Sequence, residues 1–204
     1  MNNIDLKALT RLSYGLYVLT AREGEKDNGC IVNVAAQVTD NPLQIVVAVN
    51  KKNLTHDMIV NTGRFNLSML TEKSPMELFR QFGFQSGRDV NKFEGSQDDH
   101  RAENGIRYIS QTTNTFVSGE VLQMTDLGTH TLFIAKVTEA KQLSDDPSLT
   151  YAYYHAHIKP QPAPKADKGK WVCQVCGYEY EGDEMPDDFI CPLCKHGKTD
   201  FTKQ

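Results

Sequence analysis

Residues 171–194 read WVCQVCGYEYEGDEMPDDFICPLC and contain four of the five cysteines in the chain. They form two C-x-x-C pairs, Cys173 with Cys176 and Cys191 with Cys194, and 14 residues separate the pairs. Each pair places two thiolates on a tight turn, and two such turns form a tetrahedral cage of sulfur atoms that suits zinc or a single iron. Disulfide bonds are less favoured because nothing in the sequence indicates an oxidising compartment. The spacing therefore predicts a metal site near the C-terminal end of the chain.

The net charge of the 204-residue chain is −4, and all of it lies in the segment that holds these cysteines. Residues 171–204 contain seven acidic residues and three lysines, whereas residues 1–170 contain 19 acidic and 19 basic residues. Nucleic-acid binding requires a basic face, so the charge distribution argues against that class of function. An acidic module instead favours a partner whose surface is basic.

The sequence shows no membrane or secretion signal. No apolar run approaches the roughly 18–20 residues that a membrane helix needs. The N-terminal segment MNNIDLKALTR lacks the apolar core of a signal peptide. We therefore expect a cytoplasmic protein with no membrane partner.

The composition predicts two domains and a linker. Residues 159–170 contain three of the chain's eight prolines and no large apolar residue. Alternating proline favours an extended, semi-rigid spacer. We accordingly expect one domain over residues 1–158, the linker over 159–170 and a small metal-binding domain over 171–204.

The larger domain is predicted to be mainly β with a few helices. Strand-like segments lie at residues 17–21, 30–39, 45–50, 65–70, 115–124 and 131–143, with Asn28-Gly29 as a turn between the first two. A short helix is expected over residues 55–61, capped by Asn53 or Thr55 and stopped by Gly63. Another is expected over 76–82, with Ser74 as its cap. Because the strands do not alternate with helices, the pattern favours a barrel over a doubly wound sheet.

Familiar catalytic motifs are absent from the sequence of this domain. It has no G-x-G-x-x-G after a strand, no G-x-x-x-x-G-K-[ST] and no G-x-S-x-G. Cys30 is expected to be a small buried residue. His155 and His157 have no further ligands nearby in sequence and are not predicted to bind a metal.

The C-terminal segment resembles rubredoxin, the one-iron electron carrier. The resemblance is carried by Cys173-x-x-Cys176-Gly177-Tyr178, by Cys191-Pro192-x-Cys194, and by the later Lys198 and Phe201. It implies that all four cysteines bind one iron beside an aromatic cluster, for which the chain offers Trp171, Tyr178, Tyr180, Phe189 and Phe201. Lys195 stands where such turns usually have glycine, which tolerates a positive φ. A zinc ribbon is therefore the alternative.

The N-terminal segments, taken in order, resemble the flavin-reductase-like family, which folds as an FMN-binding split β-barrel. Matching segments include residues 14–20, 28–39, 45–56, 62–68 and 82–89. By this resemblance FMN is the cofactor, and the flavin rather than a side chain accepts hydride. The residues expected to bind FMN are Asn33, Val34, Ala35, Ala36 and Gln37 along the ring, Asn50, Lys51, Lys52, Asn53 and Thr55 at the phosphate, and Phe84 and Ser86 in a flap over the flavin face.

The combination resembles the high-molecular-weight rubredoxins of anaerobic bacteria. That resemblance implies an NAD(P)H-dependent oxidoreductase in which electrons pass from NAD(P)H through FMN to a four-cysteine iron centre. A flavodiiron protein that reduces nitric oxide or oxygen is the implied acceptor, and the family implies a homodimer. Two alternatives stay open: a free-flavin reductase that supplies reduced FMN to a monooxygenase, and a non-enzymatic protein with a zinc ribbon.

Overall fold

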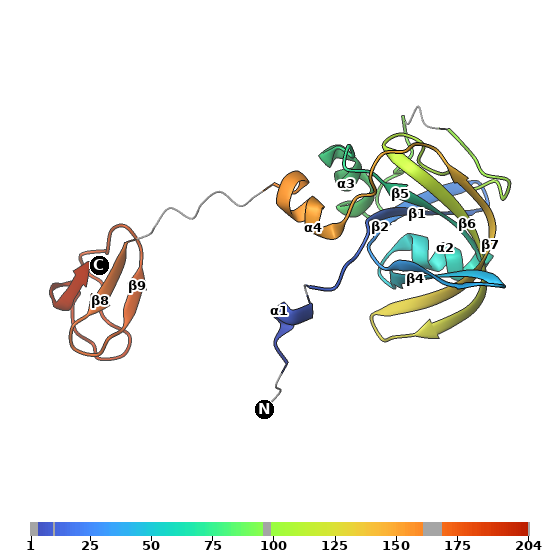
Figure 1. Ribbon diagram of the computed structural model, residues 1–204. Helices are drawn as coiled ribbons and strands as arrows, with labels where there is room; N and C mark the ends of the chain where they lie inside the picture. The colour runs from blue at the N-terminus through green and yellow to red at the C-terminus, as the bar shows by residue number, and fades with distance from the viewer. Residues whose placement is uncertain (1–3, 10, 96–98, 161–168, 204) are drawn as a thin grey trace. The chain divides into compact units, whose positions relative to one another are not determined.

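A computed structural model describes residues 4–9, 11–95, 99–160 and 169–203 of the chain. The chain divides into two compact units, residues 1–159 and 160–204 (Figure 1). Most of the predicted linker, residues 161–168, lies outside the described residues. Among the helices in the described part of the chain, none is long and apolar enough to cross a membrane.

The first unit is built on one antiparallel sheet with the strand order β2-β1-β5-β6-β7-β4-β3. Its strands are β1 (Tyr17–Glu23), β2 (Lys26–Val32), β3 (Ala35–Asp40), β4 (Leu43–Asn50), β5 (Arg64–Leu70), β6 (Thr113–Asp126) and β7 (His130–Gln142). Its helices are α1 (Leu6–Leu9), α2 (Leu54–Thr62), α3 (Met76–Gly83) and α4 (Tyr151–Tyr153), and α4 continues into a π-helical turn, η1 (Tyr154–Ile158).

The sheet curls into a split barrel around an apolar core. Register shifts in the long β6–β7 pair, at Ser118/Gly119 and Val121/Gln123, bend and twist the two strands. Leu19, Val47, Phe65 and Phe133 meet inside, and α2 adds Met58 and Ile59 to the same core. The predicted class, mainly β with a few helices and a split barrel, is therefore confirmed.

Two local predictions were wrong. Asn28-Gly29 is not a turn but part of β2, because the turn occurs at Gly24 and the Asn28 side chain is buried against Thr55. Ser74 does not cap α3: Pro75 occupies the N-cap position, and the Ser74 hydroxyl donates to the carbonyl of Thr112. The segment at residues 30–39 is divided between β2 and β3.

The second unit is a small sheet of three strands in the order β10-β8-β9. Its elements are β8 (Lys170–Cys173), β9 (Glu179–Glu181), the single 3-10 turn η2 (Lys198–Asp200) and β10 (Phe201–Lys203). Its core contains Cys173, Met185, Cys191 and Phe201. Because so small a core holds two cysteines, the fold of this unit is tied to its metal site.

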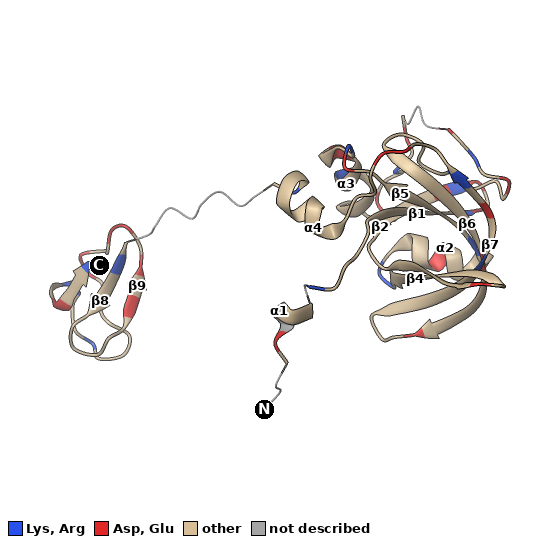
Figure 2. Ribbon diagram, viewed as in Figure 1, with Lys and Arg blue, Asp and Glu red and all other residues tan. Residues whose placement is uncertain are grey.

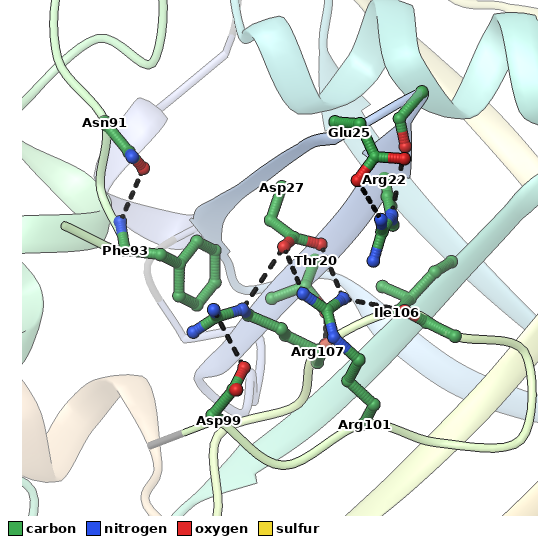
Figure 3. Close-up of polar contacts among 12 residues, drawn as sticks. Thr20, Arg22, Glu25, Asp27, Asn91, Phe93, Asp99, Arg101, Ile106 and Arg107 are labelled. Carbon is green, nitrogen blue, oxygen red and sulfur yellow. Dashed lines mark hydrogen bonds and ion pairs between the residues drawn. The ribbon is translucent and has the colours of Figure 1, made fainter. Parts of the chain in front are cut away.

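A cluster of ion pairs fastens the irregular segment 99–107 to β2 (Figure 3). Asp27 accepts hydrogen bonds from Arg101 at 3.0 and 2.7 Å and from Arg107 at 3.2 Å. Arg107 also pairs with Asp99 at 2.8 Å. Only 10% of the Asp27 side chain is exposed, so these two guanidinium groups replace the water contacts of its carboxylate. Figure 3 also shows the pair Arg22–Glu25, whose carboxylate is almost fully exposed.

We predict that Asp27→Asn lowers the free energy of unfolding of the barrel by about 2 kcal/mol, because two partly buried guanidinium groups lose their charged partner. The matched control Glu25→Gln removes an exposed pair and should cost less than about 0.5 kcal/mol. Urea unfolding followed by circular dichroism measures both. Equal losses in the two variants would show that the cluster has no special role.

Candidate functional site

The four predicted metal ligands lie together in the second unit. The Sγ atoms of Cys173, Cys176, Cys191 and Cys194 lie within 4.8 Å of one another. Cys173 and Cys194 are 3.6 Å apart at sulfur, and Cys176 and Cys191 are 3.5 Å apart. A tetrahedral metal with metal–sulfur bonds of about 2.3 Å requires sulfur separations of roughly 3.8 Å. All four are free thiols rather than disulfides, so the donor set fits one tetrathiolate metal ion.

The two C-x-x-C turns repeat the same backbone pattern. The N–H of Gly177 donates to the carbonyl of Cys173 at 2.8 Å, and the N–H of Lys195 donates to that of Cys191 at 3.0 Å. Gly177 and Lys195 occupy equivalent places and have φ values of 77° and 62°. Lys195 therefore adopts the left-handed conformation that its place in the sequence requires, despite its side chain.

The cage combines buried and exposed sulfur. Cys173 and Cys191 are buried, whereas Cys176 is exposed. Burial opposes ionisation of Cys191, yet backbone N–H groups of Cys194 and Leu193 lower the pKa of its thiol to about 7, which favours the thiolate that a metal binds. On the buried side the Phe189 ring lies 4.8 Å from Tyr180 and 5.5 Å from Phe201, as expected for the aromatic cluster.

The barrel has a cleft of about 410 Å³ between β2, α3 and the C-terminal helical segment. Four of the residues predicted to bind FMN line it: Asn33, Asn50, Asn53 and Phe84. Asn33 follows β2, Asn50 ends β4, and Asn53 is the N-cap residue of α2. Amide side chains at strand ends supply the donors and acceptors that the polar edge of a flavin ring needs.

A pocket of about 180 Å³ adjoins this cleft and contains Asn53, Thr55, Phe84 and Ser86 of the predicted set. Phe84 and Ser86 belong to the loop after α3, which is the predicted flap. The pocket includes the N-terminal turn of α2, where free backbone N–H groups favour an anion. The flap approaches closely at Gly87, where a Cβ atom would lie 2.1 Å from the Asn28 amide oxygen. Asn28 in turn donates to the Thr55 hydroxyl at 2.9 Å.

A buried lysine supports the same pocket. The Lys92 ammonium, in a residue 5% exposed, donates to the carbonyls of Gly29 at 2.9 Å and Phe82 at 3.0 Å. These contacts join the C-terminal end of α3 to β2. Burial lowers the pKa of Lys92, while the neighbouring Cys30 thiol is itself buried and its pKa is raised to about 11.

The remaining predicted FMN residues lie elsewhere. Ala35, Ala36 and Gln37 line a separate apolar cavity of about 280 Å³, together with residues of β4, β5, β6 and β7. Val34, Lys51 and Lys52 line none of the three cavities described. The Lys51 ammonium is paired with Asp126 at 2.6 Å.

Sequence reasoning missed several residues that line the cleft. The cleft is also lined by His130, the first residue of β7, and by Tyr151, His155 and Lys159 of the C-terminal helical segment. The sequence predicts no ligand role for His155, which it offers only as one of a pair with His157. His157, the other member, does not line the cleft. The spacing of Tyr151, His155 and Lys159 by four residues was the available signal, because it places them on one helical face.

Comparison with known proteins assigns both units. Residues 9–161 match the flavin reductase like domain family, and residues 171–202 match the rubrerythrin, rubredoxin-like domain family. Residues 162–170, which lie between the two matches, belong to the predicted linker.

Two curated relatives are similar over most of the chain. High molecular weight rubredoxin from Moorella thermoacetica is 36% identical, covering 97% of this chain and 99% of that protein. Ferric-chelate reductase (NAD(P)H) from Archaeoglobus fulgidus is 36% identical, covering 74% of this chain and 89% of that protein. The FMN-binding protein from Thermus thermophilus has a similar fold, with a TM-score of 0.65 at 20% identity over 80% of this chain and 97% of that one.

We predict that Lys195→Gly stabilises the small domain by about 0.5–1 kcal/mol. Glycine adopts the left-handed conformation without the steric cost of a Cβ atom, and this gain exceeds the additional chain entropy that glycine loses on folding. Gly177→Ala, at the equivalent place, should destabilise it by about 1 kcal/mol. Trp171, the only tryptophan in the chain, reports the unfolding of this domain by fluorescence. Destabilisation by Lys195→Gly would contradict the assigned backbone geometry.

Proposed function

Because the chain belongs to the flavin reductase-like family, in the high molecular weight rubredoxin form that adds a rubredoxin-like domain, we propose that it relays electrons from NAD(P)H to a protein acceptor. When bound, FMN would supply a group that accepts a hydride and releases single electrons, and an iron held by the four thiolates would supply one-electron transfer. The observation that carries this proposal is the presence of a nucleotide-sized cleft and a four-cysteine cluster in one chain.

The barrel's own residues support the binding of FMN in the cleft. Asn33 and Asn50 would orient the polar edge of the ring. The free N–H groups at the start of α2 and the buried Lys92 ammonium would favour the phosphate beneath the flap. Lys51, already paired with Asp126, is a weaker candidate for this role than the sequence predicted.

The small domain offers a contact surface beside its exposed sulfur. Val175 and Leu193, one within each C-x-x-C turn, are 54% and 69% exposed, and Ile190 is 60% exposed. Exposed apolar side chains of this kind favour a partner that docks over Cys176, because docking removes water from the contact between the two proteins. Acidic residues lie on β9 and the loop that follows it (Figure 2). An acceptor with a basic surface would therefore be favoured, and a flavodiiron nitric oxide or oxygen reductase is our candidate.

We extend the proposal to a homodimer in the cytoplasm. The edge strand β3 carries Val38, 52% exposed, beside Leu43 of β4, 43% exposed, and an exposed apolar edge is suited to pairing with a second copy. Cytoplasmic NAD(P)H and reducing conditions suit free metal-binding thiols. Sedimentation velocity would test the dimer, and a monomer at all accessible concentrations would contradict it.

The relay predicts that Cys191→Ser abolishes reduction of the acceptor while NAD(P)H still reduces the bound flavin, because one of the four thiolates that hold the iron is lost. Thr202→Ala, which changes an exposed residue of β10 in the same domain, is the control and should keep one iron per chain and full acceptor reduction. Iron content, flavin content and anaerobic reduction of a purified flavodiiron protein are measured on the same samples.

The same samples separate the alternative functions. Acceptor reduction that survives Cys191→Ser, together with readily exchanged flavin, would indicate a free-flavin reductase. A colourless protein that contains zinc would contradict the relay and indicate a non-enzymatic role.

A further inference from the structure

The C-terminal helical segment, residues 151–159, presents three side chains to the cleft: Tyr151, His155 and Lys159. The segment ends in a π-helical turn, in which the N–H of Lys159 donates to the carbonyl of Tyr154 at 2.8 Å. Such single wide turns are rare in helices and occur frequently at functional sites. Here the wide turn ends at the residue that completes the cleft wall.

The segment is held firmly against the barrel. The buried Tyr154 ring lies 4.5 Å from Phe79 of α3. The N–H of Tyr151 donates to the carbonyl of Tyr14 at 2.8 Å, and the His155 ring stands edge-on to Tyr151 at 4.4 Å. The imidazole and the ammonium are therefore presented from a fixed backbone rather than from a loose tail.

Lys159 is the charged side chain among the described residues that line the cleft, and two imidazoles accompany it. The lining of the cleft includes His130, His155 and Lys159 but, among the described residues, no aspartate or glutamate. By contrast, Glu103, Glu120 and Glu139 line a different cavity of the barrel. Imidazole and ammonium donors without competing carboxylates are suited to bind phosphate groups.

Tyr151, His155 and Lys159 form one wall of the cleft. The position of this wall indicates which phosphate-bearing ligand it can contact, the flavin or a second nucleotide. The pocket at the start of α2 shares Cys30, Asn53 and Phe84 with the cleft but none of the residues from the C-terminal segment. Figure 1 shows α4 beside α3 and apart from α2. If the flavin phosphate occupies the α2 end, the cationic wall is available to a second nucleotide. The rings of Phe84 and Tyr151, 64% and 38% exposed, offer stacking surfaces at the rim.

Resting on the proposed function, we propose that His155 and Lys159 bind the phosphate groups of the nicotinamide dinucleotide, so that the C-terminal helical segment sets the affinity for the electron donor. The redox step itself needs neither residue. Their role is to hold the donor against the flavin, through an imidazole hydrogen bond and an ammonium charge.

The test titrates the full-length, FMN-loaded protein with NADP⁺ and NAD⁺, which bind without reducing the flavin. The double variant His155→Asn with Lys159→Met should raise the dissociation constant about tenfold, as expected for loss of one charge-assisted contact in a partly exposed site. The control His157→Asn changes an exposed residue of the same segment, whose ring lies against Tyr153, and should change nothing. FMN affinity should be the same in all three proteins. A larger effect on NADP⁺ than on NAD⁺ would support contact with the additional ribose phosphate, and equal effects would support contact with the shared diphosphate.

Three outcomes would overturn the proposal. Unchanged dinucleotide affinity in the double variant, with normal flavin reduction by NAD(P)H, would refute dinucleotide binding by His155 and Lys159 while the proposed function stands. Weakened FMN binding with unchanged dinucleotide affinity would assign the wall to the flavin phosphate. A wild-type protein that binds neither dinucleotide and is not reduced by NADH or NADPH would refute the donor step of the proposed function as well.

Discussion

The ammonium group of Lys92 joins α3 to β2, and the cleft between these elements depends on that contact. Its two acceptors, the carbonyls of Gly29 and Phe82, belong to the strand and the helix that form opposite sides of the cleft. A buried ammonium is stable only where carbonyls replace its lost water, so the contact holds both backbones in place. The adjacent approach of Gly87 to Asn28 extends the same arrangement to the flap and, through Thr55, to α2.

The small domain obeys a different constraint. Its core has few large side chains, and two of its buried residues are cysteines of the four-sulfur cluster. A metal therefore supplies the stability that a core of this size cannot, and the same sulfur atoms that stabilise the fold reach the surface at Cys176. Structural role and electron-transfer role are thus combined in one set of ligands.

The sequence predicted the elements whose signals are local. The C-x-x-C spacing and the β-branched strands are local signals, and both agree with the structure. The prediction of a turn at Asn28-Gly29 was wrong because burial of Asn28 against Thr55 overrides the turn propensity of the pair. That contact joins residues 27 positions apart in the sequence. The cleft wall was missed for the same reason. The four-residue spacing places His155 and Lys159 on one helical face, but it does not show that this face lies near Asn33, which depends on the packing of Tyr154 against Phe79.

The proposed relay requires the flavin site and the four-cysteine site to form one electron pathway within the protein. The predicted linker, residues 159–170, would keep the two domains at an effective concentration near the millimolar range. Rapid anaerobic mixing of the purified protein with NADPH or NADH tests this directly. We expect the flavin absorption to fall first and the iron–thiolate absorption then to fall at a rate independent of protein concentration. An iron–thiolate absorption that stays unchanged after the flavin is fully reduced would rule out a relay within the protein.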